Sequence, residues 1–208
     1  MKTKTKLTLA ALAGAVVLAG CATYVAPTKE ESTAAVKASF RERGIAKLDR
    51  LDQNEVQALC SESQMAGKEI PKAQVEAVEK KVLATIKYPS DGKFLGDFKQ
   101  GERIAQSGVG LQWSDNEKTV SGGNCYACHQ ISPQEISHGN IGPSLLGYGK
   151  LRGNTEAVMR YTWGKIWNTH AYHLCSQMPT YGSAGILTEA QIKDVMALLL
   201  DPNSPVNK

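Results

Sequence analysis

The pentapeptide Cys125-Tyr126-Ala127-Cys128-His129 decides how this chain of 208 residues is interpreted. Two thiols at this spacing fit the two vinyl groups of one haem, and the adjoining imidazole can then bind the iron. A redox dithiol of the thioredoxin kind and half of a zinc site also contain two closely spaced cysteines. The first lacks its βαβ context here, and the second lacks another pair of ligands nearby. We therefore expect one covalently bound haem c, attached to Cys125 and Cys128, with His129 as an iron ligand.

The second axial ligand should come from the methionines and histidines that follow this motif. Met159 and Met196 fall on apolar helical stripes, where a methionine usually fills a core. Met178 instead lies in an irregular Gln-Met-Pro-Thr-Tyr-Gly stretch, where a loop can cross the open face of a haem. Ligation by His and Met raises the reduction potential, which suits an electron carrier. We predict Met178 as the second ligand, with His170 or His173 as the alternative.

The N-terminus has the pattern of a bacterial export signal, which we place at residues 1–20. Three lysines within the first six residues precede an apolar run from Leu7 to Leu18. The run ends in Leu-Ala-Gly-Cys21, which resembles the lipobox at which bacterial lipoproteins are lipidated. Ordinary signal cleavage would instead leave Cys21 as a free thiol. We expect a periplasmic lipoprotein anchored to a membrane through Cys21, because a lone cysteine directly after the apolar run has few other uses.

Net charge gives little support to a nucleic-acid partner. The full chain carries a formal charge of +4, but without the three lysines of the signal 21 basic residues face 20 acidic ones. We therefore expect a nearly neutral mature protein that binds no nucleic acid and recognises its partners through local patches. The apolar run of the signal is also shorter than the roughly 18–20 residues of a membrane span.

Composition divides the mature chain into a tether and two regions. Residues 21–29 form the tether, and residues 30–95 are rich in Ala, Glu, Lys and Gln, which predicts a helical accessory region. Glycine becomes frequent after residue 95, and most aromatic residues lie there, so we expect a second domain over 96–208. No alternating strand pattern of any length is present, and the predicted fold class is all-α with long loops.

Apolar periodicity and capping residues predict individual helices in both regions. A helix over Ser32–Leu48 would turn Val36 and Phe40 inward, and Asp52 would cap a second helix that reaches Met65. Three more helices are predicted: one from Pro71 through Ile86, one over Asp97–Ser107, and one from a Thr188–Gln191 capping box to Leu199.

Two cysteines, Cys60 and Cys175, remain outside the haem motif and the signal. An exported protein folds where disulfides persist, so the simplest expectation is that these two cysteines pair. Such a bridge would join the accessory helices to the loop that carries Met178. Alternatively, Cys175, which lies close to the proposed ligand, approaches the haem or a partner itself.

A further element lies between the haem motif and Met178, at Gly139-Asn140-Ile141-Gly142-Pro143-Ser144-Leu145. It resembles the Gly-Pro element of class I cytochromes c, in which the proline carbonyl accepts a hydrogen bond from the iron-binding histidine. The resemblance implies that Pro143 orients His129. It also implies a class I cytochrome c-like fold for residues 96–208.

Taken in order, the elements at 123–129, 139–149 and 178–182 are similar to SoxX, the small monohaem subunit of the SoxAX cytochromes of bacterial sulfur oxidation. The likeness covers roughly residues 96–208, and the N-terminal helices and the lipobox are similar to longer variants of that subunit. The resemblance implies a SoxA-like partner, with one haem or two, that joins thiosulfate oxidatively to a cysteine of the carrier SoxYZ. It further implies that SoxX accepts the released electrons and passes them to a soluble cytochrome c.

This resemblance makes the chain a subunit of an enzyme, L-cysteine S-thiosulfotransferase, that supplies electron transfer and not the substrate site. The residues agree with that role, because no nucleophile–base pair stands out beyond the haem set. The alternative is a free-standing periplasmic electron-transfer cytochrome c. A haem sensor is disfavoured, because two axial ligands leave no open iron position for a gas.

Overall fold

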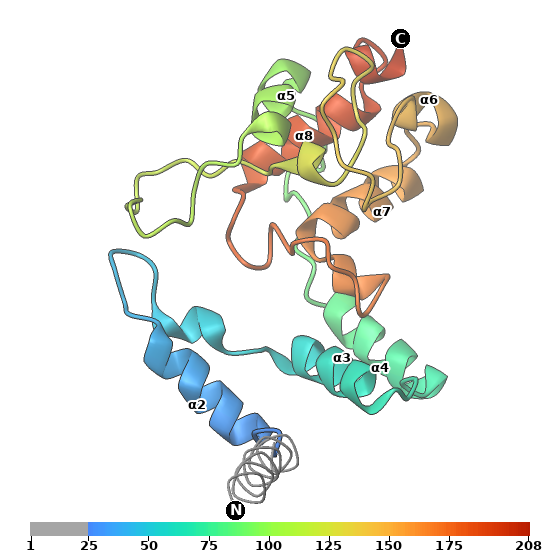
Figure 1. Cartoon of the computed structure of the whole chain (residues 1–208). Helices are drawn as coiled ribbons and strands as arrows, with labels where there is room; N and C mark the ends of the chain where they lie inside the picture. The colour runs from blue at the N-terminus through green and yellow to red at the C-terminus, as the bar shows by residue number, and fades with distance from the viewer. Residues whose placement is uncertain (1–24) are drawn as a thin grey trace, which may run out of the picture. The chain divides into compact units, whose positions relative to one another are not determined.

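The computed structural model describes residues 25–208, so the expected export signal and Cys21 lie outside the described residues. The chain divides into a unit that ends at Arg41 and a second unit, Glu42–Lys208 (Figure 1). Within residues 25–208 the structure is helical, and its β pairing is confined to an isolated bridge between Arg43 and Ala46. The all-α fold class is therefore confirmed.

The first unit contains helix α2 (Lys29–Ser39), which begins with a reciprocal capping box between Thr28 and Glu31. α2 is shorter than the predicted helix over Ser32–Leu48, and Val36 and Phe40 are exposed rather than inward. The backbone turns at Gly44, whose φ of +54° suits glycine and is incompatible with a continuing helix. The predicted long N-terminal helix is therefore wrong.

The second unit contains six α-helices and four short 3-10 helices. In chain order these are η1 (Leu48–Leu51), α3 (Glu55–Ala66), α4 (Lys72–Leu83), α5 (Phe98–Gln106), η2 (Cys125–Ala127), α6 (Tyr148–Arg152), α7 (Glu156–Trp167), η3 (Thr169–Ala171), α8 (Glu189–Leu200) and η4 (Pro205–Asn207). Among residues 25–208, no helix has both the length and the apolar character needed to cross a bilayer.

Most of the predicted helix boundaries in this unit agree with the structure. α8 starts with the Thr188–Gln191 capping box, and its apolar stripe is buried. α5 starts after its N-cap residue Asp97, whose carboxylate accepts the amide hydrogen of Lys99. α3 differs, because its capping box pairs Asn54 with Gln57 and Asp52 lies outside the helix.

The most extensive helix contact in the second unit is the crossing of α5 with α8 (Figure 1). The helices approach closely because Gly101 has no side chain: a Cβ atom at this position would overlap the backbone of Asp194. The Gly96 amide donates to the Lys193 carbonyl at 2.9 Å and the Asp97 amide donates to the Asp194 carboxylate at 2.8 Å, which fixes the start of α5 against α8. α5 also contacts η2, the turn that contains the motif at residue 125.

The helices α3 and α4 belong to the same compact unit as this crossing, so the units do not divide at the expected boundary near residue 95. α4 packs against η3, and Ile86, just beyond α4, is part of the main hydrophobic core. The buried indole of Trp163 also donates to the Lys87 carbonyl at 2.9 Å. Amino-acid composition therefore changes near residue 95, but the residues on both sides of this change pack into one hydrophobic core.

Candidate haem site

The pentapeptide at 125–129 forms a single tight turn that presents its three chemically active side chains together. The turn is η2, where the amides of Cys128 and His129 both donate to the Cys125 carbonyl, at 3.1 and 2.9 Å. Asn124 precedes it in the left-handed conformation, with φ of +47°. Both cysteines are half-buried free thiols, available for covalent attachment.

The His129 imidazole is held in one orientation by Pro143. Its Nδ1 lies 2.7 Å from the Pro143 carbonyl oxygen. Since a carbonyl only accepts, Nδ1 must carry the hydrogen, which leaves the Nε2 lone pair for iron. The Gly142 amide donates to the Cys128 carbonyl at 2.9 Å and brings this loop against the motif. A Cβ at Gly142 would overlap the His129 ring, so this close approach requires glycine.

The environment of Cys125 argues against a redox dithiol. Burial raises the pKa of the Cys125 thiol to about 12, whereas reactive cysteines in redox Cys-x-x-Cys motifs have lowered pKa values. A zinc site is also unsupported, since residues 25–208 contain no group of three or more His, Cys, Asp or Glu placed to hold a metal ion. The two thiols and the oriented imidazole instead fit haem c.

Two buried tyrosines that sequence reasoning did not single out hold the motif in place. The Tyr181 hydroxyl donates to the carbonyl of Gly123, two residues before Cys125. The Tyr126 hydroxyl donates to the Glu102 carboxylate at 2.8 Å and accepts the amide hydrogen of Ser132 at 3.2 Å. Burial is the main reason that the pKa values of both phenols are raised, so both stay protonated as donors. The signal available in the sequence was their position: Tyr126 follows Cys125 directly, and Tyr181 lies three residues after Met178.

Met178 is half-buried against the main hydrophobic core, in the loop between η3 and α8. Its backbone amide donates to the Ser176 hydroxyl at 3.2 Å. Of the competing methionines, Met196 is fully buried in the core of α8 and Met159 is half-buried in α7, as expected for core residues.

The two alternative histidine ligands differ in their surroundings. His170 is buried, contrary to a simple surface role, and its Nε2 lies 3.2 Å from the Ser176 carbonyl. His173 is exposed, and its Nδ1 lies 2.7 Å from the Tyr172 carbonyl. His170 would have to give up this hydrogen bond before that nitrogen could bind iron, which favours Met178.

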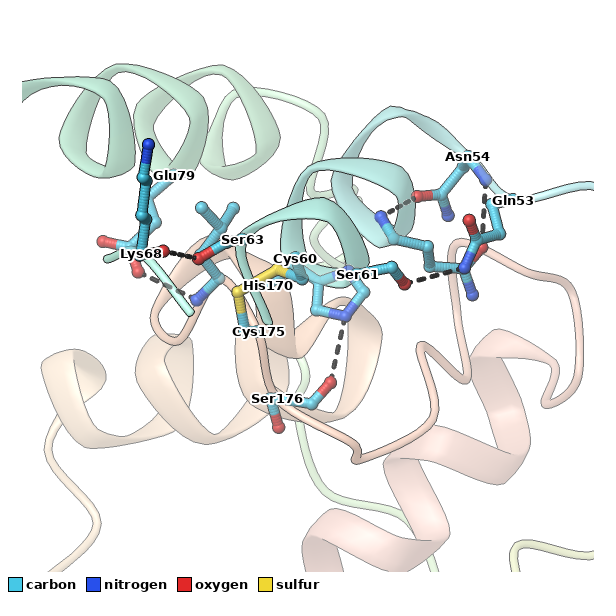
Figure 2. Close-up of a disulfide and its surroundings, with 12 residues drawn as sticks. Gln53, Asn54, Cys60, Ser61, Ser63, Lys68, Glu79, His170, Cys175 and Ser176 are labelled. Atoms are coloured by element: carbon cyan, nitrogen blue, oxygen red, sulfur yellow. Dashed lines mark hydrogen bonds between the residues drawn. A yellow bond between two sulfur atoms is a disulfide. The ribbon is translucent and has the colours of Figure 1, made fainter. Parts of the chain in front are cut away.

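Cys60 and Cys175 form a disulfide in the structure, with their Cα atoms 5.6 Å apart (Figure 2). The bridge joins α3 to the segment that leads into Met178. Next to it, the Leu174 amide donates to the Glu79 carboxylate of α4 at 3.0 Å. The structure therefore brings together the predicted cysteine pair and the loop of the predicted second ligand.

Comparison with known proteins agrees with this geometry. Residues 114–201 match the family model for cytochrome c. The chain contains a cytochrome c domain. A cytochrome c domain implies bound haem c and electron transfer. The matched residues lie within the region 96–208 and include the haem motif, Pro143 and Met178.

The chain also resembles a protein of Aquifex aeolicus (strain VF5) described as an uncharacterized lipoprotein. The two are 43% identical over 130 residues, which cover 62% of this chain and 61% of the relative. The alignment thus spans less than two thirds of that relative's length.

Proposed function

We propose that this chain is the monohaem electron-transfer subunit of a SoxAX-type complex in thiosulfate oxidation. The observation that carries the proposal is the order of the haem motif, the Gly-Pro loop and the Met178 segment, together with the hydrogen bond between His129 and the Pro143 carbonyl at 2.7 Å. These three elements are the ones through which the sequence resembles SoxX.

The residues of the site have distinct roles in this proposal. Cys125 and Cys128 would attach one haem c through thioether bonds, and His129 and Met178 would supply the two ligands to its iron. The bound haem supplies a reversible one-electron couple. Pro143 accepts the Nδ1 hydrogen of His129, which fixes the ring and leaves the Nε2 lone pair for the metal.

The partners follow from the same resemblance. A SoxA-like subunit, with one haem or two, binds thiosulfate and joins it oxidatively to a cysteine of the SoxYZ carrier. This chain takes up the electrons and gives them to a soluble cytochrome c. As part of L-cysteine S-thiosulfotransferase it contributes electron transfer and leaves substrate binding to its partner.

We also propose that the mature protein is held at a membrane, on the periplasmic side, by lipid on Cys21. The lipobox-like sequence before Cys21 supports this location, and the similar Aquifex aeolicus protein is described as a lipoprotein. The acyl anchor would keep the cytochrome c domain near its partners.

Purification from the membranes of the native host tests the complex. We expect this chain to co-purify with a larger haem protein and to contain one haem by mass. Its haem should become reduced when thiosulfate and the SoxYZ carrier are added together, and stay oxidised with either alone. A monomeric haem protein that is indifferent to thiosulfate would overturn the proposal and support the free-standing electron carrier.

A further inference from the structure

The segment from Leu174 to Met178 is irregular, yet it is anchored to neighbouring elements at successive residues. Leu174 is buried and its amide donates to the Glu79 carboxylate at 3.0 Å. Cys175 is covalently joined to Cys60. A loop tied down in this way cannot move as freely as an exposed loop of the same length.

Ser176 is the next anchored residue, and buried His170 holds it (Figure 2). His170 Nε2 lies 3.2 Å from the Ser176 carbonyl oxygen, and because a carbonyl only accepts, Nε2 carries the hydrogen. His170 is itself fixed on η3, where its amide donates to the Asn168 side chain at 3.2 Å. The fully buried Thr169 adds a second contact, since its hydroxyl lies 3.3 Å from the Ser176 hydroxyl.

Ser176 also forms a hydrogen bond with the backbone of Met178. Its hydroxyl oxygen lies 3.2 Å from the Met178 amide nitrogen and accepts that hydrogen. Ser176 therefore uses its carbonyl towards His170 and its hydroxyl towards Met178. Two hydrogen bonds through Ser176 therefore link the Met178 backbone to a buried imidazole.

We propose that His170 and Ser176 are positioning residues that fix Met178 for its bond to the haem iron. This proposal rests on the assignment of Met178 as an axial ligand under the proposed function. A thioether is a weak neutral ligand, so its bond to iron depends on how well the protein holds it in place. A loosened loop lets water or another side chain compete for the iron, and the reduction potential then falls.

The test uses the full-length, haem-loaded protein and its ferric Met-to-iron charge-transfer band. We expect His170→Ala to lose most of this band and to lower the reduction potential. His170→Gln should restore both, because the Gln amide can donate from nearly the same place as imidazole Nε2. His173→Ala is the matched control: the side chain of this exposed histidine hydrogen-bonds to the neighbouring Tyr172 carbonyl, and the backbone bonds of His173 to Thr169 and Ser176 remain in the variant, so the band should be unchanged.

Ser176→Ala provides a second, smaller change in case His170→Ala fails to fold. It removes the acceptor for the Met178 amide and leaves the Ser176 carbonyl in place, so the band should again weaken, with haem content and helical circular dichroism unchanged. A full band and an unshifted potential in Ser176→Ala and in any folded His170→Ala overturn the positioning role. Absence of the band from the unmodified protein instead overturns Met178 as a ligand, and both results are independent of the thiosulfate test above.

Discussion

At the scale of single residues, the fit between Gly142 and His129 shows how closely the loop must approach the imidazole. A Cβ at Gly142 would overlap the ring, while the Gly142 amide bonds to the Cys128 carbonyl. We expect Gly142→Ala to displace the ring and to destabilise the folded, haem-loaded protein by about 1–3 kcal/mol, as overpacking does. Denaturant unfolding measures this loss.

Gly108→Ala is the control for that substitution. The nearest atoms to a Cβ at Gly108 belong to the Asn124 side chain, at 3.5 Å, which is ordinary contact. Its free energy of unfolding should change by less than about 0.5 kcal/mol, as for other surface substitutions. Equal stability of the two variants would contradict the proposed close approach at Gly142.

A second prediction at the scale of single residues concerns Met178, the proposed second ligand of the haem iron. Met178→Ala removes the thioether, so the ferric charge-transfer band should disappear and the reduction potential should fall, because ligation by His and Met raises it. Met159→Leu keeps the packing of α7 and should leave both unchanged. Persistence of the band in Met178→Ala, or its loss in Met159→Leu, would show that another residue binds the iron.

At the scale of elements, the crossing of α5 and α8 depends on a missing side chain. Alanine usually favours a helix over glycine by about 1 kcal/mol, yet a Cβ at Gly101 would overlap the Asp194 backbone, which cannot move without moving α8. We therefore expect Gly101→Ala to lower the free energy of unfolding by about 1–3 kcal/mol. The control is Lys99→Ala, at an exposed position of the same helix. Thermal unfolding compares the two variants. If Gly101→Ala were the more stable of the two, the packing argument would be refuted.

How well the sequence predicted each element depends on whether the deciding interactions are local. Caps and apolar stripes are local, so α5 and α8 could be placed from the sequence, and the haem motif is contained in five consecutive residues. The exposure of Phe40 and the burial of His170 depend on which distant chain segments come together, and no local pattern reports that. The Tyr181 hydrogen bond to Gly123 spans 58 positions and was invisible for the same reason.

At the scale of the whole molecule, α4 and the residues that follow it share one hydrophobic core with the cytochrome c domain in the unit from Glu42 to Lys208. Ile86 and Trp163 lie in one hydrophobic cluster, although composition changes between them. Composition reports which residues a segment contains, whereas a domain boundary depends on which residues it contacts. The helices α3 and α4 therefore act as part of the scaffold that supports the Met178 loop.

The disulfide is the covalent part of that scaffold, and its contribution can be measured in the intact protein. Cys60 and Cys175 are 115 positions apart, so their bond removes much of the conformational freedom of the unfolded chain. Replacing both with serine should lower the free energy of unfolding by about 2–5 kcal/mol. The ferric charge-transfer band should be lost at a lower temperature than the helical circular dichroism, because the Met178 loop loses its nearest covalent anchor.

A thiol reductant distinguishes this effect from a general effect of the serines. In the haem-loaded protein Cys125 and Cys128 are thioethers, which thiol reductants leave intact, so Cys60–Cys175 is the disulfide that a reductant can cleave within residues 25–208. Because thiols also reduce ferric haem, the stability of both proteins is compared with the haem in the ferrous state throughout. The reductant should lower the stability of the unmodified protein to that of the doubly substituted one and leave the latter unchanged. A reductant that lowers both proteins equally would mean that it acts elsewhere, and one that lowers neither would mean that the bridge contributes nothing to stability.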